Sequence, residues 1–176
     1  MNYILDTEFI DSPNCSALIS LALVREDGAE LYAEVTEALW GRAQAADWIR
    51  ENVLPHLVGP VLPRAEVAKR IVAFAGDKPE FWADYAAYDW VVFCQLFGTM
   101  MDLPEGFPRY CRDLKQWCDA LGNPRLPEQG KGEHHALLDA RWNKQVYEFL
   151  KRYEASRGIP EMPADLDAII HAEKGR

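Results

Sequence analysis

Five residues at three places in the chain carry side chains that could share one chemical task. Asp6 and Glu8 stand at the end of the first apolar run. Asp89 follows a later apolar run, and His134 and Asp139 precede a long amphipathic segment. Carboxylates that converge without a cationic side chain are usually neutralised by a divalent cation. The set therefore favours a cation site, provided that the fold brings the three places together.

The first place is the motif Asp6-Thr7-Glu8. With 13 Asp and 15 Glu among 176 residues, chance alone supplies about one Asp-x-Glu motif, so the motif by itself means little. Its position means more, because residues two apart on a strand point to the same face and the two carboxylates would project together. Removing such a pair from water is costly unless a positive charge neutralises it.

The second place is Asp89, where a short strand and a loop of small residues should lead into a helix. A plain structural interpretation is an acid in the first turn of that helix, which the helix dipole favours without any function. Asp84 lies nearby, and we leave it outside the set. The residues alone leave both interpretations of Asp89 open.

The third place is the pair formed by His134 and Asp139. Five residues correspond to about 140° around a regular helix, so the two side chains cannot share a helical face. We expect Asp139 in the first turn of the last helix and His134 in the glycine-rich loop before it, where it can swing over whatever Asp139 binds. The structural alternative is two exposed loop histidines, His134 and His135, beside an acid at a helix start.

The elements that must position these residues form an α/β pattern. The first third of the chain predicts an antiparallel meander of three strands, over 2–8, 17–25 and 30–36, with a turn at 26–28. Two short parallel strands would complete a central mixed sheet of five strands flanked by helices. The later elements are predicted as a helix over 48–53, a helix from Pro63 to Gly76, a strand over 80–85, a helix over 88–97, a strand over 109–112, a helix over 113–121 and a last helix over 136–153.

The order of the three motifs resembles that of the DEDDh 3'-5' exonucleases of the ribonuclease H-like superfamily. It combines an Asp-x-Glu on the first strand, an Asp after the fourth strand and a His-x-Ala-x-x-Asp at the last helix. The resemblance covers Asn2 to about Tyr153. Three stretches are more closely similar to the polyadenylate-specific 3'-exoribonuclease (RNase AS) group, namely Asp6-Thr7-Glu8-Phe9-Ile10, Ala87-Tyr88-Asp89 and Gln95-Leu96-Phe97-Gly98.

This resemblance implies a fold, a reaction and a role for each motif residue. The fold would be ribonuclease H-like, and the reaction a phosphodiester hydrolysis with two Mg²⁺ ions, for which Mn²⁺ can substitute. Asp6 would bridge both ions, with Glu8 and Asp139 completing the first site. Asp89 would assist mostly through water. His134 would be the general base, since histidine titrates near neutral pH.

The resemblance also implies a substrate and an assembly. The substrate would be the 3' end of single-stranded RNA, with adenylate-rich tails preferred, and nucleoside 5'-monophosphates would be released. Thr7 and Phe9 would meet the terminal sugar and base, although Phe9 is equally well explained as a core aromatic. The group consists of small bacterial dimers, so a homodimer is expected.

Two other functions fit the same motifs. One is a DNA-directed 3'-5' exonuclease of the proofreading type, because no residue in the sequence settles the choice of sugar. The other is a non-catalytic nucleic-acid-binding module on the same fold, which would have no reason to keep all five motif residues. A purely structural domain would make the whole set a coincidence.

Length and charge limit the remaining choices. A chain of 176 residues predicts one exonuclease domain over 1–155 and a tail over 156–176, which could form a short docked helix. No apolar run is long enough to span a membrane and no signal peptide is visible, so we expect a cytoplasmic protein without a membrane partner. The net charge of −9 argues against non-specific clamping of a nucleic-acid duplex. The stretch 104–132 is locally positive, which is typical of a solvated surface of mixed charge.

The cysteines do not predict a separate chemistry. They stand at positions 15, 94, 111 and 118, without a Cys-x-x-Cys pair or a histidine at zinc-ligand spacing. Cys94 lies in an apolar run and is expected to be a small buried residue. Nothing in the sequence marks one of the four as a nucleophile.

Overall fold

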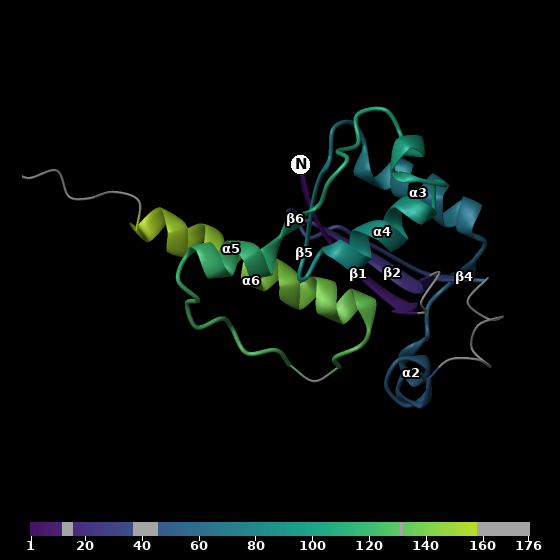
Figure 1. Cartoon of the computed structure of the whole chain (residues 1–176), viewed down its shortest axis with the longest axis horizontal. Helices are drawn as coiled ribbons and strands as arrows, with labels where there is room; N and C mark the ends of the chain where they lie inside the picture. Colours follow the sequence, from purple (N-terminus) through teal and green to yellow (C-terminus); the bar gives the residue numbers. More distant parts are fainter. Residues whose placement is uncertain (12–15, 37–45, 131, 158–176) are drawn as a thin grey trace, which may run out of the picture.

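The backbone builds one mixed sheet with the strand order β4-β3-β2-β1-β5-β6 (Figure 1). The computed structural model describes residues 1–11, 16–36, 46–130 and 132–157. The strands are β1 (Asn2–Ile10), β2 (Ala17–Arg25), β3 (Glu30–Val35), β4 (Val61–Leu62), β5 (Glu80–Ala83) and β6 (Arg112–Asp113).

The pairing confirms the predicted sheet class and corrects its size. β2 is antiparallel to both β1 and β3, as the meander requires, while β5 is parallel to β1 and β6 is parallel to β5. The prediction of five strands is wrong by one, because β4 pairs in parallel with β3. β4 has only two residues, Val61 and Leu62, between Pro60 and Pro63. Such a strand is too short to show an alternating pattern, so only its backbone pairing reveals it.

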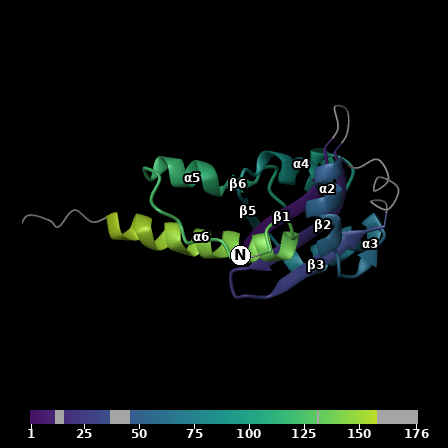
Figure 2. The same ribbon diagram turned by 90° about the horizontal axis from the view of Figure 1, so that it is seen from below.

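Helices cover both faces of the sheet. In both views α5 and α6 lie side by side and extend past one edge of the sheet, while α3 lies on the opposite side (Figure 1, Figure 2). The helices are α2 (Asp47–Asn52), α3 (Arg64–Ala75), α4 (Ala87–Gln95), α5 (Leu114–Ala120) and α6 (Ala136–Arg157), with 3-10 turns η2 (Leu54–His56) and η3 (Met100–Asp102).

Local sequence signals account for three of these helix boundaries. α3 follows Pro63 and ends at Gly76, whose φ of 62° is the left-handed value that favours glycine. α5 begins after Asp113, whose side chain accepts a hydrogen bond of 2.9 Å from the backbone N–H of Gln116. The last strand lies later than its predicted range of 109–112, because only Arg112 and Asp113 pair with β5.

Alternation along the strands divides the core into two layers. Tyr3, Leu5 and Phe81 pack with residues of α3 and α4 in one cluster. Ile4 lies on the other face, in a cluster that α5 and α6 complete. Cys94 is 5% exposed in the first layer, which confirms it as a small buried residue, and burial raises the pKa of its thiol to about 11.

α6 contributes to both core and site. Its buried positions recur at steps of three and four residues, as the sequence predicts, and it continues to Arg157. The expected docked helix of the tail falls in 158–176, outside the described residues. Within the described parts of the chain, no helix has the length and apolar character needed to cross a membrane.

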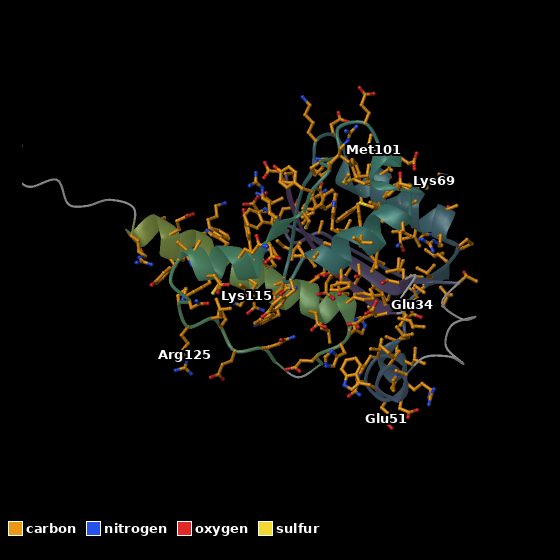
Figure 3. All side chains as sticks on the ribbon, in the orientation of Figure 1. Glu34, Glu51, Lys69, Met101, Lys115 and Arg125 are labelled. Carbon is orange, nitrogen blue, oxygen red and sulfur yellow. The ribbon has the colours of Figure 1, made fainter. Side chains whose placement is uncertain are left out.

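The locally positive stretch presents paired charges. Arg112 lies 2.9 Å from Glu80, and Lys115 pairs with Asp119. Arg125, whose side chain points away from the helices in Figure 3, lies 3.1 Å from Glu128. These contacts favour the interpretation of a solvated surface of mixed charge over that of a nucleic-acid-binding patch.

Phe81 sits at the centre of the first layer, so we predict that Phe81→Ala is strongly destabilising. The Phe81 side chain is 1% exposed, and its ring centroid lies 5.0 Å from that of Phe93 and 5.5 Å from that of Trp90. The expected loss in the free energy of unfolding is about 3–5 kcal/mol, measured by urea denaturation. Met101→Ala is the control, because Met101 lies on the surface, 63% exposed (Figure 3). Equal losses for the two variants would contradict this packing.

Candidate active site

The β1 strand brings two of the acids to the edge of the core. Asp6 and Glu8 share the strand face of Ile4, which α6 covers, because strand residues alternate between faces. Asp6 Oδ1 accepts a hydrogen bond of 3.3 Å from Asn143 Nδ2 of α6. The register of β1 against β2 shifts between Glu8 and Phe9, so the regular pairing is interrupted directly after the second acid.

The start of α6 supplies the third acid. Oxygen atoms of Asp6, Glu8 and Asp139 lie within 4.8 Å of one another. Both oxygens of Asp139 also accept hydrogen bonds, Oδ1 from Gln129 Nε2 at 2.7 Å and Oδ2 from the backbone N–H of His134 at 2.8 Å. The structure thus joins acids that lie more than 130 residues apart in the sequence.

Asp89 lies beside this group but faces a different partner. It is in the first turn of α4, 8% exposed, and its Oδ1 accepts hydrogen bonds from the Thr7 backbone N–H at 2.9 Å and the Thr7 Oγ1 at 2.7 Å. Among the described residues, the group of acids whose oxygens lie within 4.8 Å of one another consists of Asp6, Glu8 and Asp139, without Asp89. Its charge still raises the pKa of Asp6 and of Glu8, so it contributes to the field of the site.

The two residues expected to meet the terminal nucleotide are both engaged within the protein. Thr7 is 6% exposed, and its hydroxyl donates a hydrogen bond to Asp89. Phe9 packs partly against the core, and its ring stacks on that of Tyr88 with centroids 5.9 Å apart. Tyr88 is 58% exposed. This pair has the features of a core contact and of a stacking surface, so both interpretations of Phe9 stay open.

Only one of the two adjacent histidines faces the acids. His134 precedes α6 with a φ of 68°, in the left-handed region, and its ring meets the Trp48 ring edge-on with centroids 4.6 Å apart. His135 turns elsewhere and stacks on Tyr32 at 4.9 Å. Its Nδ1 accepts a hydrogen bond of 3.2 Å from the backbone N–H of Leu137. A strained backbone at a residue other than glycine is often found at functional sites.

A cavity of about 190 Å³ lies between these elements. Five of its lining residues are absent from the predicted set, namely Asp84, Gln129, Glu133, Trp142 and Asn143. Asp84 directly follows the end of β5, and Asn143 follows Asp139 by about one helical turn. The spacing of Asn143 from Asp139 is the signal that could have found it. The full lining consists of Asp6, Asp84, Gln129, Glu133, His134, Asp139, Trp142 and Asn143.

Burial and mutual repulsion disfavour the charged forms of these acids. Burial, followed by the charges of Asp89 and Asp139, raises the pKa of Asp6 well above its ordinary value. The same causes raise the pKa of Glu8 to about 8. Burial also raises the pKa of Asp139, although the hydrogen bond from the His134 backbone lowers it in part. Burial raises the pKa of Asp89 to about 6, although the hydrogen bonds from Thr7 lower it in part.

Comparison with known proteins identifies the family. Residues 1–150 match the family model described as the 3'-5' exoribonuclease Rv2179c-like domain. This chain belongs to the Rv2179c-like family. It is 39% identical over 149 residues to the 3'-5' exoribonucleases Rv2179c and MT2234.1 of two Mycobacterium tuberculosis strains, covering 80% of this chain and 88% of each relative. The resemblance to the 3'-5' exonucleases is therefore confirmed.

Solved structures show that the Rv2179c-like chain has the predicted ribonuclease H-like fold. The zinc-bound complex of E. coli ExoI with single-stranded DNA aligns with a TM-score of 0.56 at 14% identity, over 89% of this chain and 40% of that one. The RNase domain of yeast Pop2 aligns with a TM-score of 0.51 at 11% identity, over 89% and 78%. The Neurospora crassa Pan2 catalytic unit aligns with a TM-score of 0.51 at 13% identity, over 99% and 30%.

The raised pKa of Glu8 predicts how the stability of this Rv2179c-like domain changes with pH when a chelator is present. In the fold Glu8 holds its proton up to about pH 8, whereas in the unfolded chain it ionises near 4.5. Between these two pH values the folded state binds one proton more than the unfolded chain. The contribution of Glu8 to stability is therefore full below pH 4.5 and is lost as the pH rises through 8. The melting temperature in EDTA should therefore fall between these pH values.

Glu8→Gln should reduce this fall and raise the melting temperature at pH 8, as measured by differential scanning fluorimetry. Glu105→Gln is the control, because Glu105 is an exposed acid on the loop before β6 and should leave the slope unchanged. An equal slope in wild type and Glu8→Gln would show that Glu8 is not protonated in the fold.

Proposed function

We propose that this chain is a divalent-cation-dependent 3'-5' exoribonuclease that releases nucleoside 5'-monophosphates from the 3' ends of single-stranded RNA. The observation that carries the proposal is the approach of Asp6, Glu8 and Asp139 to within 4.8 Å of one another, in a member of an exoribonuclease family. His134 lines the same cavity as Asp6 and Asp139. This combination offers cation ligands and a proton acceptor at one place.

The donor set fits Mg²⁺, with Mn²⁺ as a substitute. Carboxylate oxygens are the ligands that these hard cations prefer, and a cation would relieve the repulsion that raises the pKa of Asp6 and Glu8. Asp6, Glu8 and Asp139 would hold the cations, and Asp89 would assist through water. When bound, such cations lower the pKa of a water molecule and stabilise a leaving 3'-oxygen.

The side chains around the acids supply the remaining functions. His134 would accept the proton of the attacking water, and Asp139 holds the His134 backbone in place. Trp48 packs edge-on against the His134 ring and limits its movement. The stacked rings of Phe9 and Tyr88 offer a surface on which the terminal base could stack.

RNA is the preferred substrate because the relatives at 39% identity are named 3'-5' exoribonucleases. A single strand is favoured by the net charge of −9, which disfavours tight binding of a duplex. The structural similarity to ExoI, which was solved with single-stranded DNA, makes single-stranded DNA the alternative substrate. A preference for adenylate tails, a homodimer and a cytoplasmic location stay predictions from the sequence.

The first test is degradation of matched RNA and DNA single strands labelled at the 5' end. We expect a ladder that shortens one nucleotide at a time on RNA with Mg²⁺ or Mn²⁺, and intact RNA with EDTA. Asp6→Asn and Asp139→Asn should both lose activity to background. Asp6→Asn should also melt at a higher temperature than wild type in EDTA, because repulsion is relieved. Faster degradation of DNA would favour the alternative substrate, and cleavage in EDTA would contradict the cation dependence.

The second test separates the two histidines. His134→Ala should lower kcat by about 10²–10⁴-fold, the usual range for loss of a general base. His135→Ala, which loses only the stacking on Tyr32 and a local hydrogen bond, should retain most of the activity. The reverse result would assign the general base to His135. Thermal melting of both variants controls for unfolding.

A further inference from the structure

Asn143 is the polar exception on the buried face of α6. Its side chain is 2% exposed, among apolar neighbours such as Ala140, Val146 and Tyr147 of the same helix. The Nδ2 atom donates to Asp6 Oδ1 at 3.3 Å. The Oδ1 atom is buried and has no hydrogen-bond partner in the described parts of the chain. Such an unsatisfied acceptor is destabilising, and an apolar side chain would avoid this cost.

The position of Asn143 links it to the acids. It follows Asp139 by four residues and so lies on the same face of α6, about one helical turn away. Asn143 and Asp139 both line the cavity of about 190 Å³, together with Asp6. The unpaired acceptor therefore belongs to a residue that forms a wall of the candidate site.

We propose that Asn143 is a positioning residue of the cation site, whose amide nitrogen fixes the Asp6 carboxylate. The inference rests on the proposed function. It assigns a task to the amide, and so accounts for its retention in an apolar layer despite the unpaired Oδ1.

An amide suits this task better than a cationic side chain. Lys or Arg would orient Asp6 but would also cancel its charge and compete with a metal ion, whereas Asn143 orients the carboxylate and leaves its charge available. Another carboxylate would add to the repulsion among the buried acids. Gln129 makes the equivalent contact with Asp139 Oδ1 at 2.7 Å, so neutral amides hold two of the three clustered acids.

The test compares wild type with Asn143→Ala and Asn143→Asp. Arg152→Ala, at an exposed position of the same helix, is the control for α6. Melting temperature is measured in EDTA and across a Mn²⁺ titration, which gives an apparent Kd for Mn²⁺ without any activity assay. Steady-state kinetics on single-stranded RNA at low and saturating Mn²⁺ then give kcat and KM.

Asn143→Ala should raise the apparent Kd for Mn²⁺ by about 10–100-fold, the usual effect of losing a group that orients a metal ligand. Its kcat should recover largely at saturating Mn²⁺, with KM for RNA within about twofold of wild type. Asn143→Asp keeps the shape of the side chain but adds a negative charge next to Asp6. It should melt at a lower temperature than wild type in EDTA and show a larger increase on adding Mn²⁺.

Asn143 has only a structural role if Asn143→Ala lowers the melting temperature equally in EDTA and in saturating Mn²⁺, with an unchanged Kd. That result overturns the inference and leaves the proposed function intact. If Mn²⁺ does not shift the melting temperature of wild type, the proposed cation dependence fails and this inference fails with it. Should Asn143→Ala not fold, Asn143→Asp decides, because an unchanged response to Mn²⁺ in this variant also overturns the inference.

Discussion

Repulsion among half-buried carboxylates is the constraint on which the arrangement of this molecule depends. Asp6, Glu8 and Asp139 are brought within 4.8 Å of one another although burial raises the pKa of each, and neighbouring carboxylates raise the pKa of Asp6 and of Glu8 further. The rest of the fold must supply the energy that keeps them there. The apolar layers on both sides of the sheet do so, since they pack the strand and the helix that carry these acids.

α6 shows how one element serves both needs. Its buried face is apolar over most of its length and packs on β1 and β2. At its first turns Asp139 and Asn143 line the cavity, while Ala136 and Ala140 between and before them are buried in the apolar cluster. Neighbouring positions of these turns therefore serve the core and the site in alternation.

The sequence was most informative where a repeating pattern and a motif coincide. The residues predicted Asp6 and Glu8 on one face of a strand and Asp139 in the first turn of an amphipathic helix. Their convergence was expected from the resemblance to the DEDDh exonucleases, and the structure brings these three acids together. The two-residue strand β4 could not be predicted, since backbone pairing leaves no trace in side-chain pattern. Asn143 was not predicted, although it lies one helical turn after Asp139, and Asp84 was considered and left outside the set. That both line the cavity depends on which elements meet in space. The catalytic roles of the motif residues stay predictions.

The hydrogen bond from the His134 backbone to Asp139 couples two tasks mechanically. Any change that loosens the loop before α6 would displace His134, the proposed proton acceptor, and release a carboxylate of the cluster at the same time. The effects of substitutions at the two positions should consequently be non-additive. A second substitution in a loop that the first has already loosened should add little further loss.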